Sequence, residues 1–86
     1  MDINELIAIV KKKLLCEISI ENITVEDKSF LHKNHSGNQI DKFHLKVSIK
    51  SHELKNMSRV EGDKRIYKIL NKEMKNMIHS LQILIM

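Results

Sequence analysis

The sequence predicts an α+β protein, a two-layer sandwich in which helices cover one face of a three-stranded mixed sheet. Three observations support this prediction. Apolar residues recur at helical spacing in residues 2–16 and 66–77, β-branched residues concentrate in 23–27, and apolar and polar residues alternate in 43–49 and 79–86. The order is therefore helix, strand, strand, helix, strand. At 86 residues we expect a single domain spanning the whole chain, 1–86.

The first helix is expected over residues 2–16. Asp2 followed by Glu5 resembles a capping box, which stabilises a helix start by about 1 kcal/mol. The expected buried stripe consists of apolar residues three or four apart, namely Ile3, Leu6, Ile7, Val10 and Leu14.

The first strand is expected over residues 23–27. Residues 17–22 form its approach, which could contain a bulge because the alternation slips between Ile20 and Ile23. Residues 28–41 show no periodicity, so we expect a loop, and ordered loops of this length are usually functional.

The second strand, residues 43–49, alternates strictly, which indicates one buried and one polar face. His44 and His52 are expected to face solvent at the two ends of this strand. We expect it to pair antiparallel with the first strand and a turn to follow at residues 51–56.

The second helix begins either at Ser58, which forms a capping-box pattern with Glu61, or one turn later at Gly62. Its apolar stripe is Ile66, Ile69, Leu70, Met74 and Met77, and the side chains expected in water are Arg65, Lys68, Lys72, Lys75 and Asn76. Because the third strand follows a helix, it should run parallel to one of the first two strands.

In the third strand, residues 79–86, His79 is expected to share a face with Leu81, Ile83 and Ile85. This histidine stands at a helix-to-strand junction, where a side chain is anchored and still reaches solvent. It is our first candidate for chemistry.

Composition narrows the classes of function. The formal net charge of +4 is compatible with nucleic acid or with another acidic partner. Cys16 is the only cysteine, which excludes an internal disulfide and fits a reducing compartment; its thiol is expected to be buried and unreactive. No segment has the length of a membrane span, and Asp2 and Glu5 have the wrong charge for a signal peptide. We therefore expect a cytoplasmic protein that makes no membrane contact.

Histidines are the main candidates for chemistry, since we find no catalytic constellation or phosphate-binding glycine loop and do not expect an enzyme. His32 and His35 lie in the predicted loop, which connects sheet ends and could bring either of them to His79. Two neutral imidazoles would offer nitrogen ligands to zinc or iron. Two ligands do not complete a metal site, so the alternatives are a site shared with a partner protein and ordinary surface histidines.

A nucleic-acid interface is the alternative candidate. The second helix carries a row of basic residues: Arg59, Lys64, Arg65, Lys68, Lys72 and Lys75. Such residues usually serve to solvate a helix face. Only three aromatics are present, which leaves few stacking platforms, and there is no Gly-x-x-Gly clamp of the K-homology kind.

Three motifs together resemble the BolA family. The first is Ser58-Arg59-Val60 followed by Ile66-Tyr67 and Leu70; the second is Ile78-His79-Ser80-Leu81, whose histidine is the family's most characteristic residue. The third comprises Asp27-Lys28-Ser29-Phe30-Leu31-His32 with Gly37, and then the strand Phe43-His44-Leu45-Lys46-Val47.

This resemblance implies a fold related to type II K-homology domains and partnership with a monothiol glutaredoxin. In such complexes a [2Fe-2S] cluster is shared, with thiolates from the glutaredoxin and from glutathione and histidine from the BolA-like protein. By this resemblance His79 is a ligand, with His32 as the loop ligand or His35 as its alternative. No cofactor is expected in the isolated protein, which could also form a homodimer.

One departure from the family pattern concerns DNA. Gly62-Asp63-Lys64 replaces the basic Arg-His-Arg of many members, which weakens the DNA-binding role proposed for some of them. We therefore expect a non-enzymatic glutaredoxin partner in cluster assembly, cluster transfer or iron regulation. The alternatives are a DNA-binding transcriptional regulator that uses Arg59, Lys64, Arg65 and Lys68, or an interaction module whose histidines bind nothing.

Overall fold

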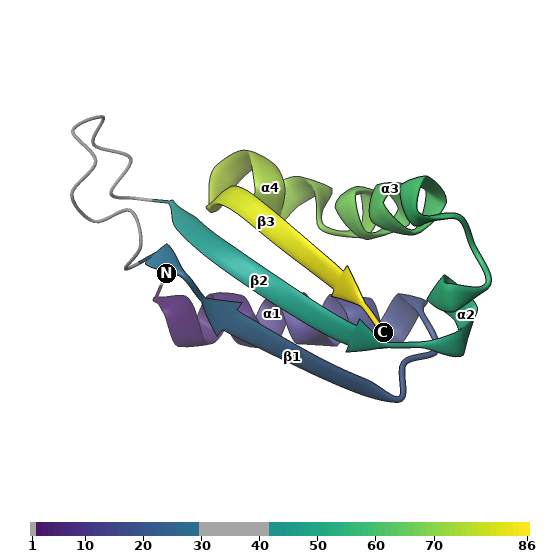
Figure 1. Ribbon diagram of the computed structural model, residues 1–86. Helices are drawn as coiled ribbons and strands as arrows, with labels where there is room; N and C mark the ends of the chain where they lie inside the picture. Colours follow the sequence, from purple (N-terminus) through teal and green to yellow (C-terminus); the bar gives the residue numbers. More distant parts are fainter. Residues whose placement is uncertain (1, 30–41) are drawn as a thin grey trace.

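The computed structural model describes residues 2–29 and 42–86. Its elements, in chain order, are α1 (Ile3–Glu17), β1 (Asn22–Asp27), β2 (Phe43–Lys50), α2 (His52–Lys55), α3 (Arg59–Ile69), α4 (Asn71–Asn76) and β3 (Ile78–Ile85) (Figure 1). The predicted order is confirmed, with one additional short helix and a break in the second long one.

The sheet has the strand order β1-β2-β3. β1 pairs antiparallel with β2, and β3 lies parallel to β2 on its other side, as the pattern of strands and helices predicts. The β1–β2 pairing runs from Asn22↔Lys50 to Asp27↔Leu45 without a bulge. β2 and β3 therefore begin at the same end of the sheet, where β1 finishes (Figure 1).

The hydrophobic core lies between the helices and one face of the sheet, so the fold has two layers (Figure 1). Helices contribute Leu6, Val10, Leu14, Leu54, Ile66 and Leu70, and the strands contribute Val25, Leu45, Val47, Ile49, Ile78, Leu81 and Ile83. The other sheet face carries the alternating polar residues of β2, which positions His44 away from the core.

Helix starts follow the predicted caps. The Asp2 carboxylate accepts a hydrogen bond from the Glu5 backbone at 2.8 Å, and Ser58 with Glu61 forms a complete capping box, so α3 begins at the earlier of the two predicted positions. The predicted turn at 51–56 instead contains α2, because the Ser51 hydroxyl caps it by accepting from the Leu54 N–H.

The second predicted helix is not continuous. Leu70, with φ −95° and ψ 18°, leaves the helical region and separates α3 from α4. Asn71, whose side chain favours helix ends, follows immediately. The break divides the apolar stripe, so Ile66 packs in the core from α3, Leu70 from the break itself, and Met74 packs against the core from α4.

Cys16 corrects a prediction, because it is exposed rather than buried. The buried positions of α1 are Leu6, Val10 and Leu14. A residue two positions after Leu14 is rotated by about 200° around the helix and so faces away from the core. Within residues 2–29 and 42–86, no helix has the length and apolarity needed to cross a membrane.

Candidate functional site

A β-bulge places His79 outside the regular pairing of β2 and β3. Phe43 pairs with Ile78, but the next residue, His44, pairs with Ser80, so His79 is the additional residue. Ile78 is 2% exposed and points into the core, whereas His79 is exposed. The prediction that His79 shares the buried face of Leu81 is therefore wrong, because the bulge shifts the alternation by one residue.

The ring of His79 contacts the ring of His44. Their centroids are 4.8 Å apart and the planes meet at 62°, an edge-on arrangement. His44 Nδ1 also forms a 2.6 Å hydrogen bond with the Ser80 hydroxyl on the neighbouring strand. His44 is thus half-buried within a cluster, against the prediction that it simply faces solvent, while the His52 side chain is 87% exposed as expected.

The His79 imidazole makes no hydrogen bond to any residue in 2–29 or 42–86. Neither of its ring nitrogens is therefore engaged by a hydrogen bond in this part of the chain. A neutral imidazole nitrogen is a good ligand for borderline transition metals. His79 combines such a nitrogen with exposure, which suits a ligand offered to a partner.

The described residues on either side of positions 30–41 are hydrogen-bonded beside this histidine pair. The Lys28 N–H donates to His44 O at 2.7 Å, and the His44 N–H donates to Ser29 Oγ at 3.1 Å. On the other side, the Phe43 N–H donates to Met77 O at 2.9 Å. His32 and His35, the predicted loop ligands, lie outside the described residues. In the described residues, no three histidine, cysteine or acidic side chains group closely enough to hold a metal ion.

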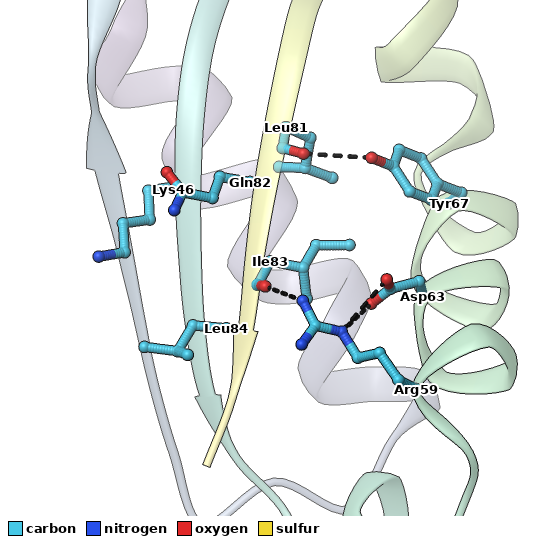
Figure 2. Close-up of a pocket in the computed structure, with 8 residues that line it drawn as sticks. All are labelled: Lys46, Arg59, Asp63, Tyr67, Leu81, Gln82, Ile83 and Leu84. Atoms are coloured by element: carbon cyan, nitrogen blue, oxygen red, sulfur yellow. Dashed lines mark hydrogen bonds and ion pairs between the residues drawn. The ribbon is translucent and has the colours of Figure 1, made fainter.

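Two predicted nucleic-acid contacts, Arg59 and Arg65, make contacts within the fold. Arg59 pairs with Asp63 at 3.1 Å and donates from Nη2 to Ile83 O at 2.6 Å. Figure 2 shows that Arg59 and Tyr67 extend from α3 towards β3, where the Tyr67 hydroxyl donates to Leu81 O at 3.1 Å. These two side chains satisfy carbonyl groups along the free edge of β3.

Gly62 and Asp63, which depart from the family pattern, have roles in the same contact. A Cβ at Gly62 would lie 3.2 Å from Ile85 Cδ1, so glycine allows α3 to approach the end of β3 closely. Asp63 accepts the Arg59 guanidinium. Gly62 therefore allows close packing between α3 and β3, and Asp63 pairs with the arginine that reaches the β3 carbonyl.

Arg65 connects three helices. Its guanidinium pairs with Glu53 of α2 and donates from Nη2 to Glu17 O at the end of α1, at 2.7 Å. The Ser19 N–H donates to Glu53 at 2.8 Å, and this bond, followed by Arg65, lowers the pKa of the Glu53 carboxyl. Arg65 is thus half-buried, against the prediction that it faces water.

Lys64 and Lys68 are the predicted nucleic-acid contacts that the structure leaves exposed and without an ion pair among the described residues. Lys68 lines a groove of about 890 Å³ between α1 and α3, together with Lys12 and the apolar side chains of Ile9 and Ile69. Fewer basic side chains of α3 are therefore free to contact a nucleic acid than its sequence indicates.

Comparison with known proteins identifies the family. The model of the BolA-like protein family matches residues 14–86. A curated relative, the DNA-binding transcriptional regulator BolA of Haemophilus influenzae, is 33% identical over 73 residues, covering 85% of this chain and 68% of the relative.

Solved structures agree. The BolA domain of SufE1 from Arabidopsis thaliana superposes with a TM-score of 0.81 at 27% identity, covering 98% of this chain and 93% of that one. BolA1 from Arabidopsis thaliana superposes with a TM-score of 0.76 at 26% identity, covering 92% of this chain and 87% of that one. The fold and the sequence motifs together show that this chain belongs to the BolA family.

Proposed function

We propose that this chain is a non-enzymatic partner of a monothiol glutaredoxin and co-ligates a [2Fe-2S] cluster, in cluster assembly, cluster transfer or iron regulation in the cytoplasm. The observation that supports this most is His79: it is exposed on a bulge, and its ring makes no hydrogen bond within the described residues. Bulges commonly redirect a side chain next to a functional site.

The residues present fit one side of a shared site. His79 offers an imidazole, and the remaining ligands would come from the glutaredoxin cysteine, from glutathione and from a loop histidine. His32 is three residues beyond Ser29, so a fully extended chain lets its Cα lie at most about 11 Å from that of Ser29. Ser29 is hydrogen-bonded to His44, which contacts His79, so the described chain reaches residue 29 close to this histidine pair, and His32 is the proposed loop ligand with His35 as its alternative.

Imidazole ligation would distinguish this cluster from one held only by thiolates. Replacement of thiolate by histidine raises the reduction potential of a [2Fe-2S] cluster. Because histidine binds only in its neutral form, ligation would also depend on pH. The isolated protein is expected to carry no cluster.

The test is co-expression with a monothiol glutaredoxin, anaerobic purification, and visible absorption and circular dichroism. We expect a coloured 1:1 complex whose spectrum differs from that of the glutaredoxin homodimer. His79→Ala should abolish this mixed-ligand spectrum, and His52→Ala, which removes an exposed histidine on α2, should leave it unchanged. A spectrum that survives His79→Ala would exclude His79 as a ligand, and a colourless protein that does not co-purify would exclude the shared cluster.

DNA binding is the second candidate, because the curated relative from Haemophilus influenzae is named a DNA-binding transcriptional regulator. Here Lys64 and Lys68, exposed on α3, would supply phosphate contacts. In fluorescence anisotropy with duplex DNA, Lys64→Ala with Lys68→Ala should reduce the slope of log K against log salt by about 2. Lys50→Ala, at an exposed position on β2, is the matched control. Equal slopes for the wild type and the double variant would remove α3 as the interface.

A further inference from the structure

His44 is held more firmly than an ordinary surface histidine. Its backbone N–H donates to Ser29 Oγ at 3.1 Å, and its carbonyl oxygen accepts from Lys28 N–H at 2.7 Å. Its ring bonds through Nδ1 to Ser80 Oγ at 2.6 Å. Three separate contacts therefore fix the backbone and the ring of His44.

His79 is held in the opposite way. The bulge fixes its backbone beside β2, but its exposed ring has no hydrogen-bond partner in residues 2–29 and 42–86. An exposed imidazole without partners rotates freely about two side-chain torsions. Within the described residues, the His44 ring packs edge-on against this imidazole at a centroid distance of 4.8 Å.

We propose that His44 is a positioning residue for His79. Metal-binding histidines usually gain their orientation by donating the second ring N–H to a carboxylate or carbonyl group, which commits one nitrogen. Here a neighbouring ring that is itself anchored supplies the orientation, so both nitrogens of His79 stay open. For cluster binding this inference rests on the proposed function, but the orienting contact belongs to the isolated protein.

Three substitutions test the ring contact and the hydrogen bond to Ser80 separately. His44→Ala removes the ring contact and the bond to Ser80. His44→Phe retains an aromatic ring against His79 but loses Nδ1, and Ser80→Ala retains the His44 ring but loses the hydroxyl that holds it. His44 is half-buried outside the core, so the variants should fold, as far-UV circular dichroism will verify.

The first experiment uses NMR of the isolated protein at a single fixed pH. In the wild type we expect nuclear Overhauser effects between the His44 and His79 rings and three-bond couplings that report one χ1 rotamer of His79. His44→Ala should give averaged couplings, and His44→Phe should largely preserve the wild-type rotamer. His52→Ala is the control and should change neither. An unchanged His79 rotamer in His44→Ala would overturn the inference.

The second experiment uses the complex with a monothiol glutaredoxin. Loss of an orienting partner typically weakens metal binding by about 10-fold to 100-fold, so His44→Ala should lower cluster retention by about 10-fold and shift the dichroism spectrum. His44→Phe should recover most of the lost cluster retention. If the wild type forms the mixed-ligand complex and His44→Ala retains the cluster equally well with the same dichroism spectrum, the positioning role is excluded while the proposed function stands. If the wild type forms no complex, the proposed function fails and the NMR result decides the orienting contact.

Discussion

Residues of the BolA family motifs lie at the beginning of β3 and along the contact between α3 and the outer edge of β3. The polar side chains of these two regions are used differently. At the beginning, the bulge turns His79 outward, and its ring has no hydrogen bond within the described residues. Along the edge, Arg59 and Tyr67 donate to Ile83 O and Leu81 O (Figure 2). The first region leaves an exposed side chain without a hydrogen bond among the described residues, and the second uses its side chains to hold α3 against the sheet.

This difference changes how the motif residues are interpreted. Arg59 belongs to a basic row that would suggest nucleic acid, yet its guanidinium is committed to Asp63 and to a strand carbonyl. A hydrogen-bonded cation at a strand edge loses part of its ability to contact phosphate, because the new contact must replace existing bonds. We therefore expect substitutions along the α3 contacts to change stability, and substitutions at His79 to change cluster ligation.

The largest effect on stability should come from Arg65→Ala. This change removes the ion pair with Glu53 and the bond to Glu17 O, which tie α3 to α2 and to the end of α1. Hydrogen bonds to charged groups contribute about 1.5–3 kcal/mol, and partial exposure lowers this, so we expect a loss of about 1–2 kcal/mol in urea unfolding. Lys64→Ala, next in the chain but without an ion pair among the described residues, should change stability by less than about 0.5 kcal/mol.

The same variant carries a pH dependence. The Ser19 N–H and then Arg65 lower the folded-state pKa of Glu53 below its ordinary value of 4.5. The stabilisation from this carboxylate is therefore present above about pH 4.5 and is lost as the pH falls through the lowered pKa. The stability difference between wild type and Arg65→Ala should narrow over this acidic range. A difference that stays constant between pH 7 and pH 3 would show that the ion pair between Arg65 and the Glu53 carboxylate contributes nothing to stability.

Much of the fold could be predicted from the residues because the relevant signals are local. Strict alternation placed the second strand within one residue of Phe43–Lys50, and Ser58 with Glu61 gave one of the two predicted starts for α3, the one that the structure has. The break at Leu70 was missed, since the apolar spacing continues through it and conceals the change in backbone direction.

The candidate site was harder to predict because it depends on the register between two parallel strands joined by a helical crossover. The sequence pointed to His79 as a candidate, but not to the bulge that exposes it, although Ile78 and Leu81 are apolar residues three apart, a spacing that breaks the period of two. The contact between His44 and His79 was not predicted at all. This contact depends on β2 and β3 beginning side by side, and no local pattern specifies that register.

A smaller effect is expected for Tyr67→Phe, which tests whether α3 seals the edge of β3. The change keeps the ring and removes the hydroxyl that donates to Leu81 O at 3.1 Å. Because a typical hydrogen bond contributes about 1 kcal/mol, we expect a loss of about 0.5–1.5 kcal/mol and faster amide exchange in β3 than in β1. Unchanged exchange in β3 would mean that Tyr67 does not protect this edge.

The smallest effect on stability should come from His79→Ala, the substitution with the largest expected effect on cluster ligation. The side chain is exposed and has no hydrogen bond in residues 2–29 and 42–86, so its removal leaves no buried group unsatisfied. We expect the free energy of unfolding to change by less than about 0.5 kcal/mol in urea. A loss above about 1 kcal/mol would indicate that the His44 contact stabilises the bulge itself. His79 would then contribute to the stability of the fold, as Arg59 and Tyr67 do, and the two regions of β3 would no longer differ in this respect.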